Sequence, residues 1–240
     1  MEDIGSIARQ NIEKIKNSDY PGRGIVLGVS PSGKELVQIY WTMGRSASSK
    51  NRMMCKEDGV VKVKPIDESV EMQNESLIIY NATAHVGKAH VVTNGRQTDT
   101  IAEYLKNGKS FEGALREWSF EDDPPIYTPR ISGLVFADGA NSICMLSIIK
   151  ALGQNPDLLT HQFFEYNTSL PGYGHCIHTY SLSKICDSFS GEPYLLTVFD
   201  DINENAEHYW NALPKDKRVA LYVKHINIIN GEAADRIINN

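Results

Sequence analysis

The side chains best suited to binding a phosphate group lie between residues 43 and 64. This stretch holds six lysines and arginines against two acids, in a chain whose net charge is -6. Arg45 and Arg52 can each offer two donors to a phosphate, and Ser46 and Asn51 add polar groups between them. The pattern indicates a phosphate-binding loop, although the composition alone is equally that of a solvated basic loop.

Three acids begin the proline-rich segment 121–129, and an arginine follows it. Glu121, Asp122 and Asp123 follow one another, and Arg130 comes directly after the segment, where a core strand is expected to begin. An acid and this arginine can meet in a functional site, or they can form an ordinary surface ion pair, which contributes little to stability. The sequence leaves both interpretations open.

Polar residues at 94–99 stand where a predicted strand ends and a helix begins. The free backbone N–H groups at a helix start can bind an anion or a polar ring substituent, which makes Asn94, Thr98 and Asp99 candidates for ligand binding. Thr98 and Asp99 are also suited to capping the helix, which is the commoner role for such residues.

Histidines and a cysteine cluster at residues 172–178, a composition that metal sites share. His175 and His178 are three residues apart in a predicted strand, so their side chains point to opposite faces. No second pair of ligands stands at zinc spacing, and we therefore predict no metal site. A histidine packed at a strand end is the expected role, with proton transfer by one of the two as the alternative.

Sheets and helices have to position these candidates, and short turns join three pairs of β-type runs, which is typical of hairpins. The pairs are 24–30 with 35–42, 76–83 with 89–93, and 131–137 with 142–150. Further strands are expected at 60–63, as an edge strand, and at 176–183, 194–199 and 219–229. Helices are expected at 3–17, 99–107, 111–118 and 203–213.

Short turns between adjacent strands, with helices arriving in blocks, favour antiparallel sheets over a repeated βαβ unit. Several strands are apolar on both faces, so we expect two sheets packed face to face. The predicted fold class is α+β, a four-layer αββα sandwich of two mainly antiparallel sheets with helices on the outer faces. We expect one domain over residues 1–240, in which 1–19 form an N-terminal helical extension.

Composition excludes several classes of protein. No apolar run approaches the roughly 18 residues of a membrane span, and charges interrupt the N-terminal helix where a secretion signal would be apolar. We therefore expect a cytoplasmic protein without a membrane partner. The 30 acids against 24 basic residues give the wrong sign for binding duplex nucleic acid. The four cysteines include no C-x-x-C pair and are expected to be free thiols.

Six short motifs, in order over residues 20–131, resemble the archaeal-type IMP cyclohydrolase family. They are Tyr20-Pro-Gly-Arg23, Gly44-Arg45-Ser46, Asn51-Arg52, Tyr80-Asn81, Asn94-Gly-Arg-Gln-Thr-Asp-Thr100 and Thr128-Pro-Arg-Ile131. The resemblance implies a fold like that of the N-terminal-nucleophile hydrolases, in agreement with the αββα expectation. It also implies an enzyme that closes 5-formamidoimidazole-4-carboxamide ribonucleotide to IMP with loss of water, the last step of purine synthesis.

In the implied reaction the substrate's carboxamide nitrogen attacks its own formyl carbon, so no metal or redox cofactor is expected. An enzyme gains most by holding the two groups together, by placing donors near the formyl oxygen and by moving a proton. On this basis the expected substrate-binding residues are Arg23, Arg45, Ser46, Asn51, Arg52, Asn94, Thr98 and Asp99. The expected catalytic residues are Glu121 for proton transfer, Arg130 for the developing oxyanion, and Tyr40. Tyr80, His175 and His178 are further candidates for proton transfer.

The implied partner is a small nucleotide rather than a nucleic acid, and the resemblance is compatible with a homo-oligomer such as a tetramer. Asp122 and Asp123 are placed as well as Glu121 for proton transfer by sequence alone. Two other functions fit the same residues. One is an amide hydrolase that acts on a related nucleotide, and the other is a purine-nucleotide-binding module without turnover.

Overall fold

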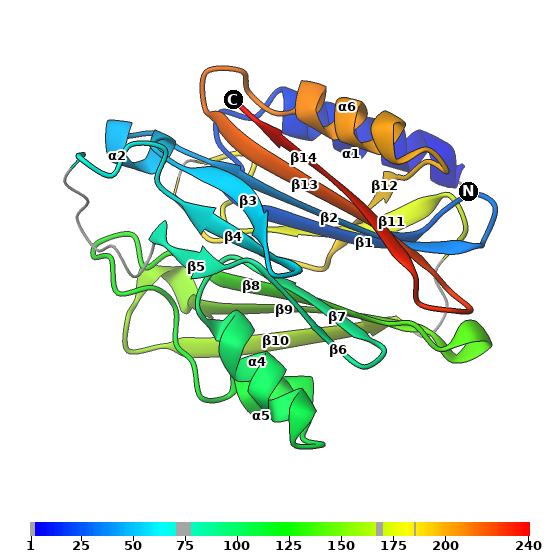
Figure 1. Ribbon diagram of the computed structural model, residues 1–240. Coiled ribbons are helices and arrows are strands. Elements are labelled where there is room, and N and C mark those ends of the chain that lie inside the picture. The colour runs from blue at the N-terminus through cyan, green and yellow to red at the C-terminus, as the bar shows by residue number, and fades with distance from the viewer. Residues whose placement is uncertain (1–2, 71–77, 167–169, 185) are drawn as a thin grey trace.

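Two antiparallel β-sheets stacked face to face form the centre of the molecule (Figure 1). The computed structural model describes residues 3–70, 78–166, 170–184 and 186–240. The first sheet contains, in spatial order, β12 (Tyr194–Thr197), β11 (Tyr173–His178), β1 (Gly24–Val29), β2 (Glu35–Met43), β13 (Arg218–Asn227) and β14 (Ala233–Asn239). The second contains β10 (Leu159–Tyr166), β9 (Ile143–Ala151), β8 (Arg130–Phe136), β7 (Ala89–Thr93) and β6 (Thr83–Val86).

The apolar contact between the sheets explains why their strands are apolar on both faces. Ile25 and Leu27 of β1 belong to the apolar cluster between the sheets, together with Ile131 and Ile148 of the second sheet. Val26 of β1 belongs to a different cluster, beneath the helices that cover the first sheet. The alternation of side chains along a strand therefore divides β1 between two apolar regions and buries all of it.

Helices cover the outer face of each sheet (Figure 1). They are α1 (Ile4–Lys16) and α6 (Ile202–Ala212) on the first sheet, and α4 (Gln97–Lys106) and α5 (Phe111–Leu115) on the second. The one-turn helix α2 (Ala47–Lys50) follows β2 and covers neither face. Ile12, Ile15 and Tyr209 are buried against the first sheet, and Ile101 and Phe111 against the second. The predicted α+β class with antiparallel sheets is confirmed. Within the described ranges, every helix is too short or too polar to cross a bilayer.

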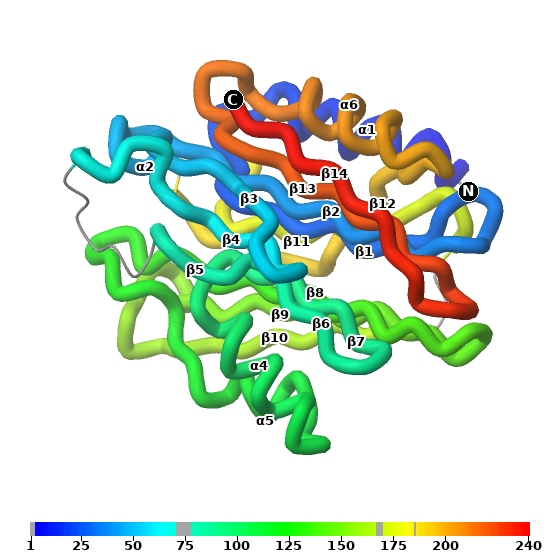
Figure 2. The backbone as a smooth tube through the Cα atoms, viewed as in Figure 1, coloured from blue at the N-terminus to red at the C-terminus, as the bar shows by residue number. Residues whose placement is uncertain are grey.

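A third sheet, which the sequence patterns do not predict, joins one side of the two main sheets (Figure 2). It consists of β3 (Met53–Glu57), β4 (Val60–Lys64) and β5 (Tyr80–Asn81). The Asn239 side chain of β14 hydrogen-bonds both backbone groups of Met54, at 2.8 and 3.0 Å. The Val61 backbone N–H donates to Thr83 of the second sheet at 2.9 Å. The strand expected at 60–63 is confirmed as β4, but its expected edge position is wrong, because β4 lies between β3 and β5.

Several boundaries also differ from the sequence expectations. The strand paired with β7 is β6, whereas the expected partner was the run 76–83. Part of that run lies outside the described residues, which omit 71–77. Its end, Tyr80–Asn81, pairs with β4 instead. Strands β10 and β14 are unpredicted edge strands, since their half-exposed, mixed sequences give no continuous apolar run. The helix expected at 111–118 ends at Leu115, and β11 ends at His178 rather than at residue 183.

The strand ends that carry the candidate residues lie close together, at the same end of neighbouring strands. Strand β1 begins at Gly24, which lies opposite Trp41 of β2 and His178 of β11. The segments before β1, after β2 and after β11 therefore lie side by side. The indole N–H of Trp41 donates to the carbonyl of Gly22 at 2.9 Å, which fixes the segment that leads into β1. Strand β8 of the second sheet begins at Arg130.

The close contact between Gly24 and Trp41 generates a test. A Cβ atom on residue 24 would lie 1.9 Å from Cζ2 of Trp41. Gly24→Ala should lower the free energy of unfolding by about 1–3 kcal/mol, the usual cost of overpacking a core, as measured by urea denaturation. In Gly113→Ala of α5 the nearest atom, Oγ of Ser110, would lie 3.2 Å from the new Cβ, so the free energy of unfolding should change much less. Equal stability of the two variants would contradict this packing.

Candidate active site

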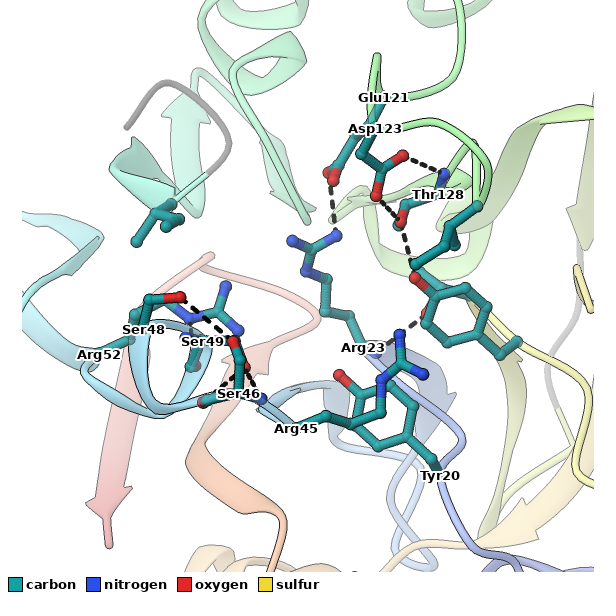
Figure 3. Close-up of a pocket in the computed structure, with 14 residues that line it drawn as sticks. Tyr20, Arg23, Arg45, Ser46, Ser48, Ser49, Arg52, Glu121, Asp123 and Thr128 are labelled. Atoms are coloured by element: carbon teal, nitrogen blue, oxygen red, sulfur yellow. Dashed lines mark hydrogen bonds and ion pairs between the residues drawn. The ribbon is translucent and has the colours of Figure 1, made fainter. Parts of the chain in front are cut away.

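A cavity of about 500 Å³ brings together segments that are far apart in the chain (Figure 3). Tyr20 and Arg23 come from the segment before β1, and Arg45 comes from the segment after β2. Glu121 comes from the loop before β8, and Tyr180 from the segment after β11. The cavity therefore lies where loops from both sheets meet, and its volume is that of a small-molecule site.

An ion pair between Arg23 and Glu121 lines the cavity. A guanidinium nitrogen of Arg23 donates to Oε1 of Glu121 at 2.9 Å, and the two side chains are 12% and 2% exposed. Arg130 places a guanidinium nitrogen 4.0 Å from the same oxygen. Burial raises the pKa of Glu121, and Arg23 and Arg130 offset part of that rise. A carboxyl group in this environment can exchange a proton with a ligand.

Arg130 stands behind Glu121 and is not among the described residues that line the cavity. Its Nε donates to the carbonyl of Ser119 at 2.9 Å, and a terminal nitrogen donates to Oε1 of Gln97 at 3.2 Å. The guanidinium carbon lies 4.8 Å from the centre of the Trp118 ring. The acid and the arginine predicted to meet therefore do so as buried groups, with Arg130 held in place to act on Glu121.

A serine-rich turn after β2 forms another side of the cavity. Oγ of Ser46 accepts from the backbone N–H of Ser49 at 3.1 Å, and Oγ of Ser49 accepts from the N–H of Ser46 at 2.9 Å, which caps α2. Ser48 also lines the cavity. Arg45 is exposed, with its guanidinium carbon 5.0 Å from the centre of the Tyr20 ring. No carboxylate of the described residues pairs with Arg45, so the turn presents a free positive charge and several hydroxyl groups.

Arg52 supports this turn from within. It is buried, and its guanidinium donates to the carbonyl of Ser49 at 2.8 Å and to the carbonyl of Met43 at 3.0 Å. These bonds use two of its nitrogens on the backbone. Arg52 therefore fixes the shape of the turn, although it also lines the cavity.

Three of the four lysines of residues 43–64 have carboxylate partners elsewhere. Lys62 and Lys64 pair with Glu57 at 2.9 and 2.7 Å, and Lys56 pairs with Asp235 of β14. Hydrogen bonds from Lys64 and Lys62 lower the pKa of Glu57 to about 2. The excess charge of this stretch is therefore not gathered at one ligand, and the lysines lie outside the cavity.

Asn51 and Asp99, both predicted to bind substrate, are bound to other parts of the chain. The Asn51 amide exchanges hydrogen bonds of 2.7 and 2.9 Å with the backbone of Asp67. Asp99 accepts from the side-chain amide of Asn81 at 2.7 Å, and both line a separate groove beside β4. The described lining of the cavity contains neither predicted residue.

Asn94 and Thr98 are buried in the wall of the fold. Asn94 donates to the carbonyl of Pro129 at 2.9 Å and accepts from the N–H of Ile131 at 2.8 Å, which fixes the start of β8. Thr98 does not cap α4 as expected, because the helix begins at Gln97, two residues before the expected start at 99. The Thr98 hydroxyl lies 2.6 Å from that of Thr93. The Asn94 side chain thus fixes the backbone at the start of β8, and the Thr98 hydroxyl donates to the backbone carbonyl of Gly95.

Tyr40 is fully buried, is not among the described residues that line the cavity, and shares a hydrogen bond of 2.7 Å with the hydroxyl of Tyr80. Burial, reinforced by Tyr80, raises the pKa of Tyr40 well above its usual value. Burial opposes the charge on Arg23, but Glu121 and these tyrosines together hold its pKa well above its ordinary value. The tyrosine pair thus forms a polar support next to the ion pair.

His175 and His178 lie on opposite faces of β11, as their spacing predicts. His175 stacks on Tyr166 of the second sheet, with ring centres 3.5 Å apart. His178 donates through Nδ1 to the carbonyl of Tyr180 at 2.5 Å and lies edge-on to Phe189. In the part of the chain that the structure describes, no three His, Cys, Asp or Glu side chains are placed to hold a metal ion.

A hydrogen-bonded chain at the cavity contains residues that the sequence did not single out as site residues. Thr128 donates its hydroxyl to Asp123 at 2.5 Å and lies 2.6 Å from the hydroxyl of Tyr180. The Tyr180 ring stacks on Tyr20 at 5.7 Å. The motif before β1 contains Tyr20 and the one before β8 contains Thr128, whereas Tyr180 lies beyond residue 150, where no motif marks it.

Comparisons with known proteins agree on one family. A family model described as "IMP cyclohydrolase-like protein" matches residues 20–232. A Haloarcula marismortui protein named IMP cyclohydrolase is 36% identical over 126 residues, covering 51% of this chain and 57% of the relative. Proteins of that name from Methanococcus maripaludis strain C7 and Methanocaldococcus jannaschii are each 33% identical, over 50% and 48% of this chain. The matches span only 60% and 56% of those two relatives.

Buried His178 generates a pH dependence of stability. Burial lowers the pKa of its ring to about 4, from the usual value of about 6.5. The unfolded chain takes up this proton as the pH falls through about 6.5, but the folded chain does so only near the lowered pKa, so the free energy of unfolding should fall across that window. His178→Gln should remove about 3 kcal/mol of this fall.

Urea denaturation of both proteins at the two ends of the window measures the effect. Other histidines contribute to each slope but cancel in the difference between the two proteins. An identical pH dependence in the His178→Gln protein would contradict the burial of a neutral ring at this position.

Proposed function

Because the chain belongs to the IMP cyclohydrolase-like family, we propose that it closes 5-formamidoimidazole-4-carboxamide ribonucleotide to IMP with loss of water. The chain matches little more than half the length of its named relatives. The observation that carries the proposal is the buried pair of Arg23 and Glu121 beside a turn bearing Arg45 and serine hydroxyls. One wall thus suits proton exchange and the other suits a phosphate.

The phosphate of the nucleotide is assigned to the turn after β2. Arg45 offers an exposed guanidinium, and Ser46 and Ser48 offer hydroxyl groups on the same side of the cavity. A phosphate dianion binds guanidinium and hydroxyl donors through charge-assisted hydrogen bonds. Arg52, which holds the backbone of the turn, keeps these donors in position without having to contact the ligand.

The reacting groups are assigned to the wall formed by Arg23 and Glu121. The carboxamide nitrogen bonds to the formyl carbon, and the formyl oxygen gathers negative charge that the Arg23 guanidinium can stabilise. The oxygen then takes one proton from the attacking nitrogen and one from the former formamido nitrogen, and it leaves as water while a C=N bond forms. Glu121 is placed to carry these protons.

The neighbours of this wall hold its geometry. Arg130 lies 4.0 Å from the Glu121 carboxylate and is fixed by Ser119 and Gln97, so it positions Glu121 rather than the substrate. Holding two groups of one molecule in a reactive arrangement supplies a large part of the acceleration of ring closure. A rigid wall of this kind suits that requirement.

Incubating the purified protein with the formamido ribonucleotide tests the proposal directly. The expected result is IMP, followed by its purine absorbance and identified by chromatography. Binding of the nucleotide without any IMP would favour a binding module instead. Conversion of a different nucleotide amide, with no IMP formed, would favour a related hydrolase.

Replacing Glu121 isolates proton transfer. Glu121→Gln keeps the size of the side chain but removes its ability to accept a proton. We expect kcat to fall by about 100-fold or more, with nucleotide affinity largely kept, because general acid–base catalysis contributes about that much. Asp122→Asn, on the exposed neighbouring acid, is the matched control and should leave kcat unchanged. Unchanged turnover in the Glu121 variant would exclude it as the proton carrier.

Replacing Arg45 isolates phosphate binding. Arg45→Ala should weaken nucleotide affinity by about 10-fold or more, the usual loss for a charged hydrogen bond, measured by calorimetry with IMP. Lys64→Ala removes a positive charge from the same stretch, but that charge is paired with Glu57 outside the cavity, so affinity should hold. Equal losses in the two variants would mean that general charge, not this turn, attracts the nucleotide.

A further inference from the structure

A buried lysine outside the candidate active site lacks a charged partner. Lys150 stands near the end of β9 and is 3% exposed. Its ammonium group donates to the backbone carbonyl of Phe189, and no carboxylate of the described residues pairs with it. An ammonium group carries three donors, and burying a charge without a counter-charge is costly. A bound anion would therefore stabilise the Lys150 ammonium group at this position.

Lys150 lines a second cavity, of about 300 Å³. Ser188 lines the same cavity, and its hydroxyl oxygen is buried with no hydrogen-bond partner within the described residues. Buried polar atoms without partners are uncommon in folded proteins, and a bound water or ion is one way to satisfy them. Leu152 and Gln154 also line the cavity and are exposed, so a small molecule can enter from solvent.

The carboxylate among the residues lining this cavity already has partners. Asp187 pairs with Lys184 at 2.9 Å and accepts from the side-chain amide of Gln154 at 3.3 Å. Lys150 and Lys184 together therefore leave one positive charge uncompensated in the described lining. Charge and donor groups both favour an anionic occupant over a neutral one.

We propose that this cavity binds a small oxyanion, a phosphate or a carboxylate, between the Lys150 ammonium and the Ser188 hydroxyl. The oxygens of such an ion accept from the ammonium donors that Phe189 leaves free and from the serine. Burial alone lowers the pKa of Lys150, and a bound anion would offset that effect. The site is separate from the nucleotide cavity and does not depend on the proposed reaction.

The two cavities lie on either side of one folded segment. Thr179 and Tyr180 line the nucleotide cavity, and Ser188 lines the second one. The backbone joins them, since Tyr180 pairs with Ser188 and the Phe189 N–H donates to the carbonyl of Thr179 at 3.0 Å. A test with phosphate must therefore distinguish binding in the two cavities.

Nuclear magnetic resonance titration with inorganic phosphate makes this distinction. The amide signals of Gly153 and Ser188 should shift saturably in the parent protein. Lys150→Met removes the charge while keeping an unbranched side chain, and should weaken this binding by about tenfold or more. The same spectra show whether the variant, which loses the hydrogen bond to the Phe189 carbonyl, is folded. Arg45→Ala should leave the same shifts unchanged, because Arg45 lies in the other cavity.

A parallel titration with acetate identifies the ligand class. Stronger saturation by phosphate assigns the site to phosphate groups, and stronger saturation by acetate assigns it to carboxylates. Ser188→Ala, which removes one neutral donor, should weaken binding of the preferred ion less than Lys150→Met does. The proposal is overturned if neither ion gives saturable shifts, or if the Lys150→Met protein gives the same shifts as its parent.

Discussion

The buried ion pair of Arg23 and Glu121 is the constraint on which the rest of the candidate site depends. Taking two charges out of water costs several kcal/mol for each ion, and only close, hydrogen-bonded geometry offsets that cost. Arg23 precedes a strand of the first sheet, and Glu121 lies in the loop before a strand of the second. The pair therefore requires one fixed stacking of the sheets, which the apolar cluster between them provides.

Several buried polar residues meet this requirement by holding the backbone on each side of the pair. Trp41 binds the carbonyl of Gly22, just before Arg23 in the chain. Asn94 hydrogen-bonds the backbone on both sides of Arg130, at the start of β8. Arg130 in turn lies 4.0 Å from the Glu121 carboxylate. Such residues do not need to touch a ligand, because their effect on the chemistry is to keep the two charges aligned.

The sequence could predict the parts of this arrangement that depend on local pattern. Alternation and turns predict the hairpins, and the motifs containing Arg23 and Arg45 lie in the walls of the cavity. A polar side chain in a motif looks the same whether it binds substrate or a backbone carbonyl, so the burial of Asn94 and Thr98 was not predictable. Tyr180 and the third sheet depend on pairing between distant segments, for which the sequence carries no local signal.

The same electrostatic constraint separates Arg23 from Lys150. Arg23 has a carboxylate at 2.9 Å, and its charge is balanced within the chain. Lys150 has a backbone carbonyl, whose dipole only partly replaces the water lost on burial. A fold that keeps such a lysine gains little stability from it. An anion from outside the chain would balance this charge as Glu121 balances that of Arg23.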